Sequence, residues 1–245
     1  MSVGLPHSRQ SLLELRRFYL GLGILLAVLA TIGFWPRYFG PLLSGGIDRE
    51  PVIHIHAAVY VGWLALFILQ CVLVVAGRIA LHRQVGKFGI VYGCVVVVVG
   101  LATTVTRFAT KLAEGGIEAV QNTAIFPLTD MLLFSGFFAA AVYYRSNPDV
   151  HRRLMVVAAS TILVASTARF TGGLGYEGTP FHAINLALWL SPILIAMAYD
   201  FARHRKIHAA YVVGGTAIAL SSFRGPLQYT DTWMHFTHWL ASVLP

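Results

Sequence analysis

Residues 53–77 read IHIHAAVYVGWLALFILQCVLVVAG, a run without a single acidic, lysine or arginine side chain. A helix needs about 20 mostly apolar residues to cross the hydrocarbon core of a bilayer. The stretch is long enough, and it predicts a transmembrane helix. Two histidines, His54 and His56, stand at its start. Lipid does not require them there, so they raise the question of a polar site near one membrane surface.

The rest of the chain has the same character. Of 245 residues, 57% are hydrophobic and 11% are charged, and the mean hydropathy is +0.70, whereas a soluble chain carries about 25% charged residues. The sequence lacks the alternating pattern of a membrane β-barrel. We therefore predict an all-α polytopic membrane helix bundle that forms a single integral membrane domain over 1–245. Its seven transmembrane helices are expected near 18–40, 53–77, 87–107, 123–144, 153–170, 180–200 and 208–224.

The distribution of lysine and arginine predicts the orientation. When the loops are assigned alternately to the two sides, twelve of these residues fall on the N-terminal side and six on the other. Cytoplasmic loops are enriched in Lys and Arg, so we expect the N-terminus in the cytoplasm and the C-terminus outside a bacterial inner membrane. The net charge of +8 then reflects topology. Because no basic stripe lies on a soluble module, no nucleic-acid partner is expected.

Three segments of the chain resemble one another. Each starts with His-Arg on the cytoplasmic side and ends with [Ser/Thr]-x-x-Arg on the other, at Arg107, Arg169 and Arg224. The preceding helices carry a polar residue seven positions before an aromatic one, in the pairs His56 and Trp63, Asp130 and Phe137, and His182 and Trp189. This pattern predicts one leading helix followed by three pseudo-repeated hairpins, in units of about 51–108, 123–171 and 179–225.

Such a repeat would bring His56, Asp130 and His182 to one level below the outer surface. An ionisable group within a span costs about 2.5–3.5 kcal/mol and usually has a partner. Two imidazoles and a carboxylate suit zinc, iron or copper, so the trio is a candidate divalent-metal site. Haem b is an alternative cofactor, with His56 and His182 as axial ligands. In the structural alternative, the histidines lie at the interface and Asp130 bonds to Ser or Thr.

Three more histidines are possible additional ligands. His54 is two residues from His56 and points away from it on a helix, so it either covers the site or contacts headgroups. His235 and His238 belong to a C-terminal segment, about 229–242, that is too short and polar for an eighth span. Its apolar arc predicts an interfacial helix on the outer surface.

Arg107, Arg169 and Arg224 lie on the side that the positive-inside rule depletes. The planar guanidinium group suits bidentate binding of an anion or of haem propionates. The structural alternative is that the three side chains snorkel to the outer interface.

Two phrases carry a resemblance. ALHRQVGKFG (80–89) and NPDVHRRLM (147–155) resemble uncharacterised bacterial multi-span membrane proteins in which such His-Arg hairpins recur, and this resemblance implies no activity. The architecture is also similar to that of MHYT-type sensor domains, for which metal binding has been proposed. The Met-His-Tyr-Thr motif itself is not matched around His54 or His182.

These patterns lead to three functional hypotheses. The first is a metal site of His56, Asp130 and His182 that performs redox or hydrolytic chemistry on a small or lipidic molecule. The second is a transporter or channel that uses the same residues as a proton or cation relay. The third is a sensor or assembly factor without turnover, whose partner proteins the sequence does not identify. The lipid bilayer is an expected partner in all three.

Overall fold

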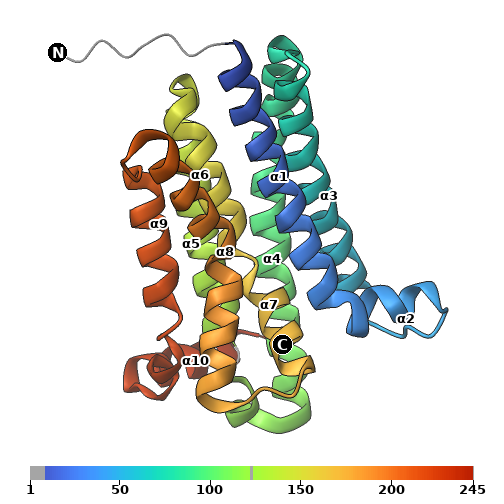
Figure 1. Cartoon of the computed structure of the whole chain (residues 1–245). Coiled ribbons are helices and arrows are strands. Elements are labelled where there is room, and N and C mark those ends of the chain that lie inside the picture. The colour runs from blue at the N-terminus through green and yellow to red at the C-terminus, as the bar shows by residue number, and fades with distance from the viewer. Residues whose placement is uncertain (1–8, 122–123, 245) are drawn as a thin grey trace.

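The structure is a computed structural model that describes residues 9–121 and 124–244 (Figure 1). The described part is all-helical, with 88% helix and no strand, as the sequence predicts. Residue 123, where the fourth predicted span and the second predicted repeat unit begin, lies outside the described residues, together with 1–8, 122 and 245.

Five helices are long: α1 (Arg9–Phe34), α3 (Pro51–Val75), α4 (Ile79–Gln121), α5 (Ile125–Tyr143) and α8 (Gly178–His204). The medium-length helices are α6 (Pro148–Thr161), α7 (Val164–Gly173), α9 (Ala209–Ser221) and α10 (Asp231–Val243). Short π- or 3₁₀-helical turns and one α-turn complete the described chain: η1 (Trp35–Phe39), α2 (Gly40–Leu43), η2 (Tyr144–Ser146) and η3 (Gly225–Tyr229).

By length and composition alone, fewer helices are able to cross a membrane than the seven that the sequence predicts. In the described part of the chain, five helices are long and apolar enough to cross a membrane, and α6 with α7 adds a sixth as one bent span. Helix α9 has 13 residues, or about 20 Å of helix, which is less than the roughly 30 Å of hydrocarbon. The helices are compatible with a multi-pass membrane protein, but seven spans are not confirmed.

The helices run alternately between two ends of the bundle (Figure 1). We call the end at which α1 starts the N-side, and the end at which α10 lies the C-side. Helices α3, α5 and α8 run toward the N-side, whereas α1, α4, the pair α6–α7 and α9 run toward the C-side. The loops α5–α6 and α8–α9 therefore lie on the N-side.

Helix α6 is the centre of the bundle. It packs against α1, α5, α8 and α9, and a continuous stretch from Val156 to Thr161 is buried. Gly214 of α9 makes one of these contacts possible, because a Cβ atom there would overlap the side chain of Val157. Small residues allow helices to approach closely in lipid, where burial of apolar surface provides no driving force.

The helical structure is interrupted between α6 and α7, and the axes of the two helices are bent by 45° relative to each other. No proline or glycine causes the break, since the sequence there is Ser160-Thr-Ile-Leu-Val164. The Thr161 hydroxyl donates to the carbonyl of Ala158, and the carbonyl of Ser160 accepts from the Trp189 indole of α8 at 2.8 Å. These bonds satisfy backbone groups that an interrupted helix leaves open in lipid.

Helix α4 extends beyond the predicted end of its span at residue 107 and reaches Gln121, with a kink at Gly116, where φ is +70°. The extension packs against α10 through Phe108, Leu112, Trp233 and Leu240. Helix α10 occupies Asp231–Val243, close to the predicted interfacial segment 229–242, and it lies on the C-side (Figure 1).

Candidate functional site

An ion pair is buried near the C-side of the bundle. Asp130, in the second turn of α5, lies with its Oδ1 atom 2.6 Å from Nη2 of Arg224, which immediately precedes η3. The two residues are 7% and 5% exposed. The Arg224 guanidinium also lies over the rings of Phe126 and Trp189, at 5.1 and 5.7 Å from their centroids. A charged pair is thus enclosed by aromatic faces.

This pair leaves donors unused. Within the described residues, Nε and Nη1 of Arg224 have no hydrogen-bond partner, and neither does the buried Oε1 of Gln228 in η3. A guanidinium group has five N–H donors, and desolvated donors without a partner are costly. The C-side pair is therefore joined by one contact where two parallel ones are possible.

A stack of two rings of α3 contacts Met131, the residue that follows Asp130 in α5. The Tyr60 hydroxyl donates to Sδ of Met131 at 3.3 Å, and the imidazole of His56 stacks on the Tyr60 ring at 4.1 Å. Gly100 of α4 leaves the space for these side chains, since a Cβ atom there would overlap both the Tyr60 hydroxyl and the Met131 sulfur. His56 thus faces its neighbours in the bundle, as predicted.

A second ion pair is buried near the N-side. Arg153 of α6 donates from Nε and Nη2 to the two carboxylate oxygens of Asp200 of α8, at 2.9 and 2.8 Å. Its Nη1 donates to the backbone carbonyl of Asp149 at 2.8 Å. Arg153 and Asp200 are 3% and 2% exposed. All three guanidinium nitrogens are bonded, so this pair is bidentate and much better satisfied than the C-side pair.

Other polar contacts surround the N-side pair. The hydroxyl groups of Tyr19 and Tyr211 lie 3.0 Å apart and connect α1 to α9. His208, just before α9, accepts a hydrogen bond at Nδ1 from the backbone N–H of Ala210. Burial, followed by the positive charge of Arg153, holds the pKa of His208 below its usual value. The neutral imidazole is therefore favoured, and it caps α9.

The predicted metal trio does not come together as one ligand set. Asp130 is paired with Arg224, His56 is stacked on Tyr60, and His182 is exposed at the start of α8. Over residues 9–121 and 124–244, no group of three His, Cys, Asp or Glu side chains is placed to hold a metal ion. In the described part of the chain, His56, Asp130 and His182 are therefore not gathered as one set of metal ligands. The ring of His56 has a half-buried tyrosine partner instead.

The possible additional ligands are also separate. Nδ1 of His54 lies 2.9 Å from the Tyr38 hydroxyl of η1. His235 and His238 are exposed on α10. Among the described residues, Asp130 is paired with Arg224 and not with any of these three histidines.

The three arginines predicted to bind an anion or haem propionates have three different environments. Arg107 pairs with Glu50 at 2.9 Å in an exposed position. Arg169 donates to the carbonyl of Ala165 and lies over the ring of Phe34. Arg224 alone pairs with a buried carboxylate. The three positions are not equivalent, and the threefold repeat that relates them gains no support from these contacts.

Sequence reasoning missed the Arg153–Asp200 pair. Arg153 belongs to the His-Arg-Arg segment that the charge distribution explains as a topology signal. A signal for the pair does exist: Asp200 lies within the last turns of an apolar helix that ends on the same side as Arg153. A carboxylate at that depth requires a cation.

The chain was also compared with models of known protein families, with curated proteins and with solved structures, and no match was found. The two buried ion pairs and the broken helix between them are therefore the observations from which a function is inferred.

Proposed function

We propose that the protein is a proton-linked membrane transporter of a small molecule, with the Asp130–Arg224 pair as its C-side gate and the Arg153–Asp200 pair as its N-side gate. A gate is here an ion pair that closes one end of the bundle and separates when that end opens. The observation that carries the proposal is the buried, incompletely bonded Asp130–Arg224 pair.

The first support is the cost of placing charges inside the bundle. Ionisable groups within membrane spans are rare, and they mark substrate paths and proton relays. A buried ion pair is weak evidence for stability, because desolvation can exceed the Coulombic gain. Replacing a buried ion pair by well-packed apolar residues is often neutral for stability, so a role in function explains the presence of Asp130 and Arg224 better.

The second support is the difference between the two pairs. The N-side pair uses both carboxylate oxygens of Asp200 and all three guanidinium nitrogens of Arg153. The C-side pair has a single short contact. Protonation of Asp130 removes the charge that holds Arg224, and it leaves Arg224 buried and uncompensated. Movement of the Arg224 side chain toward water then lowers the free energy, and this movement opens the C-side.

The third support is the break between α6 and α7. Discontinuous helices near the centre of the membrane are a feature of many transporters. The break follows α6, the helix at the centre of the bundle, and lies C-terminal to Arg153. Trp189 connects this break to the C-side pair, because its indole N–H donates to the Ser160 carbonyl at the break and the Arg224 guanidinium lies over its ring. A movement of Arg224 would therefore reach the hinge between α6 and α7 through one side chain.

The proposal includes a topology. We place the N-side in the cytoplasm of a bacterium and the C-side outside the inner membrane, with α9 as a short seventh span whose path η3 completes. The supporting observation is the charge bias of the loops. In this orientation the proton reaches Asp130 from the outside, and α10 lies on the outer surface.

The test is transport by the purified protein in proteoliposomes. The vesicles receive an inward proton gradient and a defined mixture of small organic solutes, and their contents are measured by mass spectrometry. We expect at least one solute to accumulate, and a protonophore to abolish its accumulation. Asp130→Asn should remove the gradient-driven part, since the amide cannot carry the proton.

Asp231→Asn is the matched control, because Asp231 is exposed on α10. It should transport like the wild-type protein. Equal gradient-driven uptake by Asp130→Asn and the wild type would overturn the proposal, and so would the absence of any protein-dependent solute in the wild-type vesicles.

A further inference from the structure

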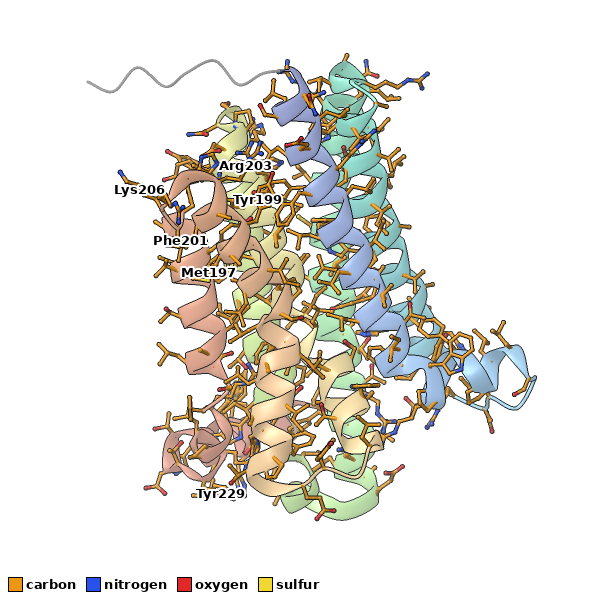
Figure 2. The ribbon with its side chains drawn as sticks, in the orientation of Figure 1. Met197, Tyr199, Phe201, Arg203, Lys206 and Tyr229 are labelled. Carbon is orange, nitrogen blue, oxygen red and sulfur yellow. The ribbon has the colours of Figure 1, made fainter. Side chains whose placement is uncertain are left out.

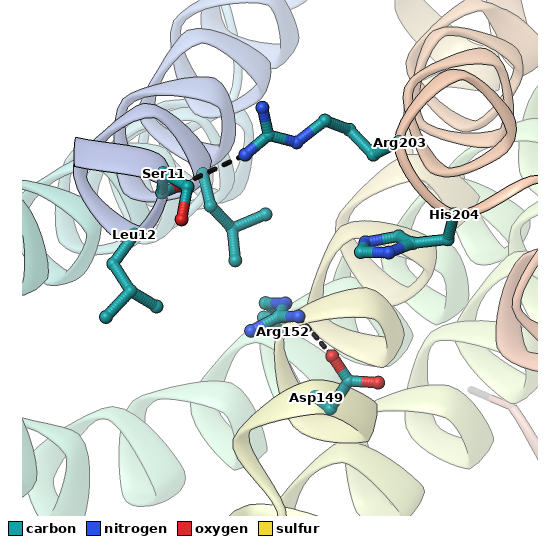
Figure 3. A pocket seen from close by; sticks show the side chains of 7 residues that line it. Ser11, Leu12, Asp149, Arg152, Arg203 and His204 are labelled. Atoms are coloured by element: carbon teal, nitrogen blue, oxygen red, sulfur yellow. Dashed lines mark hydrogen bonds and ion pairs between the residues drawn. The ribbon is translucent and has the colours of Figure 1, made fainter. Parts of the chain in front are cut away.

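A pocket opens on the N-side between the start of α1, the start of α6 and the end of α8. Its lining consists of Ser11, Leu12, Leu15, Asp149, Arg152, Arg203 and His204 (Figure 3). None of these residues belongs to the C-side pair. The pocket lies where three predicted spans reach the same membrane surface, which is the depth of lipid headgroups.

Two arginines stand on opposite sides of this pocket. Arg203 donates to Glu14 at 3.0 Å and to the Ser11 carbonyl at 3.4 Å. Arg152 pairs with Asp149 and lies over the ring of Tyr19 at 5.4 Å. Figure 3 shows both guanidinium groups and the His204 ring beside the same opening. The contacts hold the two cations in place, so little side-chain entropy is lost when an anion binds between them.

The remaining wall is apolar. Leu12 and Leu15 of α1 line the pocket, and Leu12 is 39% exposed. A pocket with fixed cations and an open aliphatic wall fits a molecule that has an anionic head and a hydrocarbon part. A free inorganic anion would not use the leucine wall. Basic pockets between membrane helices on the cytoplasmic side bind lipid headgroups.

We propose that this pocket binds the phosphate group of an anionic phospholipid, with Arg152 and Arg203 as its two cationic contacts and with Leu12 and Leu15 beside the start of an acyl chain. The bound lipid joins α1 to α6 and α8. This inference does not depend on transport, because the two cationic contacts, Arg152 and Arg203, belong to neither proposed gate. Asp149 of the lining also bonds to Arg153 of the N-side pair, so the variants that test the lipid site leave Asp149 unchanged.

The test is lipid retention by the full-length protein. The protein in detergent is mixed with phosphatidylglycerol or with phosphatidylcholine, and bound lipid is counted by native mass spectrometry, with thermal unfolding measured in parallel. We expect phosphatidylglycerol to be retained preferentially and to raise the unfolding temperature. Arg203→Gln should weaken its apparent affinity about fivefold, since one basic side chain near an anionic lipid contributes about 1 kcal/mol.

Lys206→Gln is the matched control. Lys206 lies on the same side as Arg203, as Figure 2 shows, and does not line the pocket. Its substitution should leave retention unchanged. If all basic substitutions reduce retention equally, the lipid is attracted by the general surface charge and the proposal is wrong.

Leu12→Trp provides a second variant that leaves every ion pair in place. The larger side chain should fill the pocket and reduce phosphatidylglycerol retention. This variant keeps the test possible if Arg203→Gln fails to fold. Unchanged retention in Leu12→Trp would overturn the proposal. Millimolar inorganic phosphate, added to protein in phosphatidylcholine, separates the two phosphate sources. Stabilisation by inorganic phosphate equal to that by phosphatidylglycerol would show a site for the free anion and would also contradict a lipid site.

Discussion

Asp130 and Asp200 are both buried carboxylates paired with arginine, yet their pairs are constructed differently. Asp200 receives two parallel hydrogen bonds from a guanidinium group whose third nitrogen is also bonded. Asp130 has one short contact with Arg224. Bidentate pairs are the stronger and geometrically more specific kind. The two sites should therefore respond differently to substitution.

Arg153→Gln should destabilise the protein by about 3–5 kcal/mol, because it leaves Asp200 buried without its counter-ion. Arg107→Gln breaks an ion pair whose side chains are 43% and 38% exposed, and it should cost less than about 1 kcal/mol. Unfolding in mixed detergent and SDS micelles measures both. Equal destabilisation by the two substitutions would contradict the structural difference between a buried pair and an exposed one.

Replacing both partners is a separate check on the N-side pair. The double variant Arg153→Met with Asp200→Leu removes both charges together, and it should recover most of the stability lost in Arg153→Gln. A double variant as unstable as the single one would show that the arginine stabilises the protein by its packing alone.

His208 should make stability depend on pH. Burial and Arg153 lower the pKa of His208 in the folded state, so the unfolded chain, with a pKa near 6.5, binds the proton more readily. Stability is then fully present above about pH 6.5 and falls as the pH drops below that value. Thermal unfolding between pH 8 and pH 5 should show the decrease, and His208→Asn, which retains a capping acceptor, should reduce it. An identical decrease in both proteins would show that other groups cause it.

At the level of residues, the sequence identifies members of the C-side site but not their partnership. Asp130 and Arg224 stand out separately, because each is a charge that lipid disfavours. Their pairing depends on how α5 meets the end of α9, which residue spacing does not specify. The assumed repeat gave Asp130 two histidine partners instead. In the structure, Asp130 is paired with Arg224.

Helix α6 illustrates what the sequence predicts at the level of elements. Its apolar pattern predicts a span over 153–170, and α6 with α7 covers that range. The break after Thr161 was not predicted, because the usual signals, proline and glycine, are missing from 160–164. It depends on a tertiary contact, the Trp189 indole at the Ser160 carbonyl. The extension of α4 to Gln121 was missed because residues 108–121 contain Lys111, Glu114 and Glu118 and form no long apolar run.

Close packing of α1 on α7 leads to a prediction with an internal control. A Cβ atom on Gly33 would overlap the backbone carbonyl of Ser166, whereas a Cβ atom on Gly21, in the same helix, would meet nothing within 4 Å. Gly33→Ala should destabilise the protein by about 1–3 kcal/mol. Gly21→Ala should be neutral or stabilise it by up to about 1 kcal/mol. Detergent unfolding decides, and tolerance of Gly33→Ala would show that α1 and α7 are not in backbone contact.

At the scale of the whole molecule, the two ion pairs lie toward opposite ends of one helix bundle. Arg153–Asp200 joins α6 to α8 near the N-side, and Asp130–Arg224 joins α5 to the end of α9 near the C-side. The broken helix and Trp189 lie between them. For the transporter proposed above, alternating access requires that one end opens while the other stays closed. In that proposal, the weaker C-side pair is the end that responds to a proton.

The apolar runs predicted the class of the molecule, because the length and apolar character of a span are local properties of the sequence. The all-helical fold and the multi-pass character follow from them directly. The bend between α6 and α7, in the fifth predicted span, and the short α9 do not, since they depend on how neighbouring helices satisfy backbone groups. The count of seven runs is therefore less informative than the contacts between them.

If Asp130 controls the C-side, removing its charge must expose the residues beside Arg224. In a protein with Cys71 and Cys94 replaced by Ala, a cysteine at position 228 replaces the half-buried Gln228 of η3, whose Oε1 atom is buried. A membrane-impermeant maleimide is added outside, and the labelling rate of this cysteine is measured in three proteins. One retains Asp130, one carries Asp130→Asn, and the control carries Asp231→Asn. We predict labelling several-fold faster in Asp130→Asn alone. Equal rates in all three proteins would contradict a gate at this ion pair.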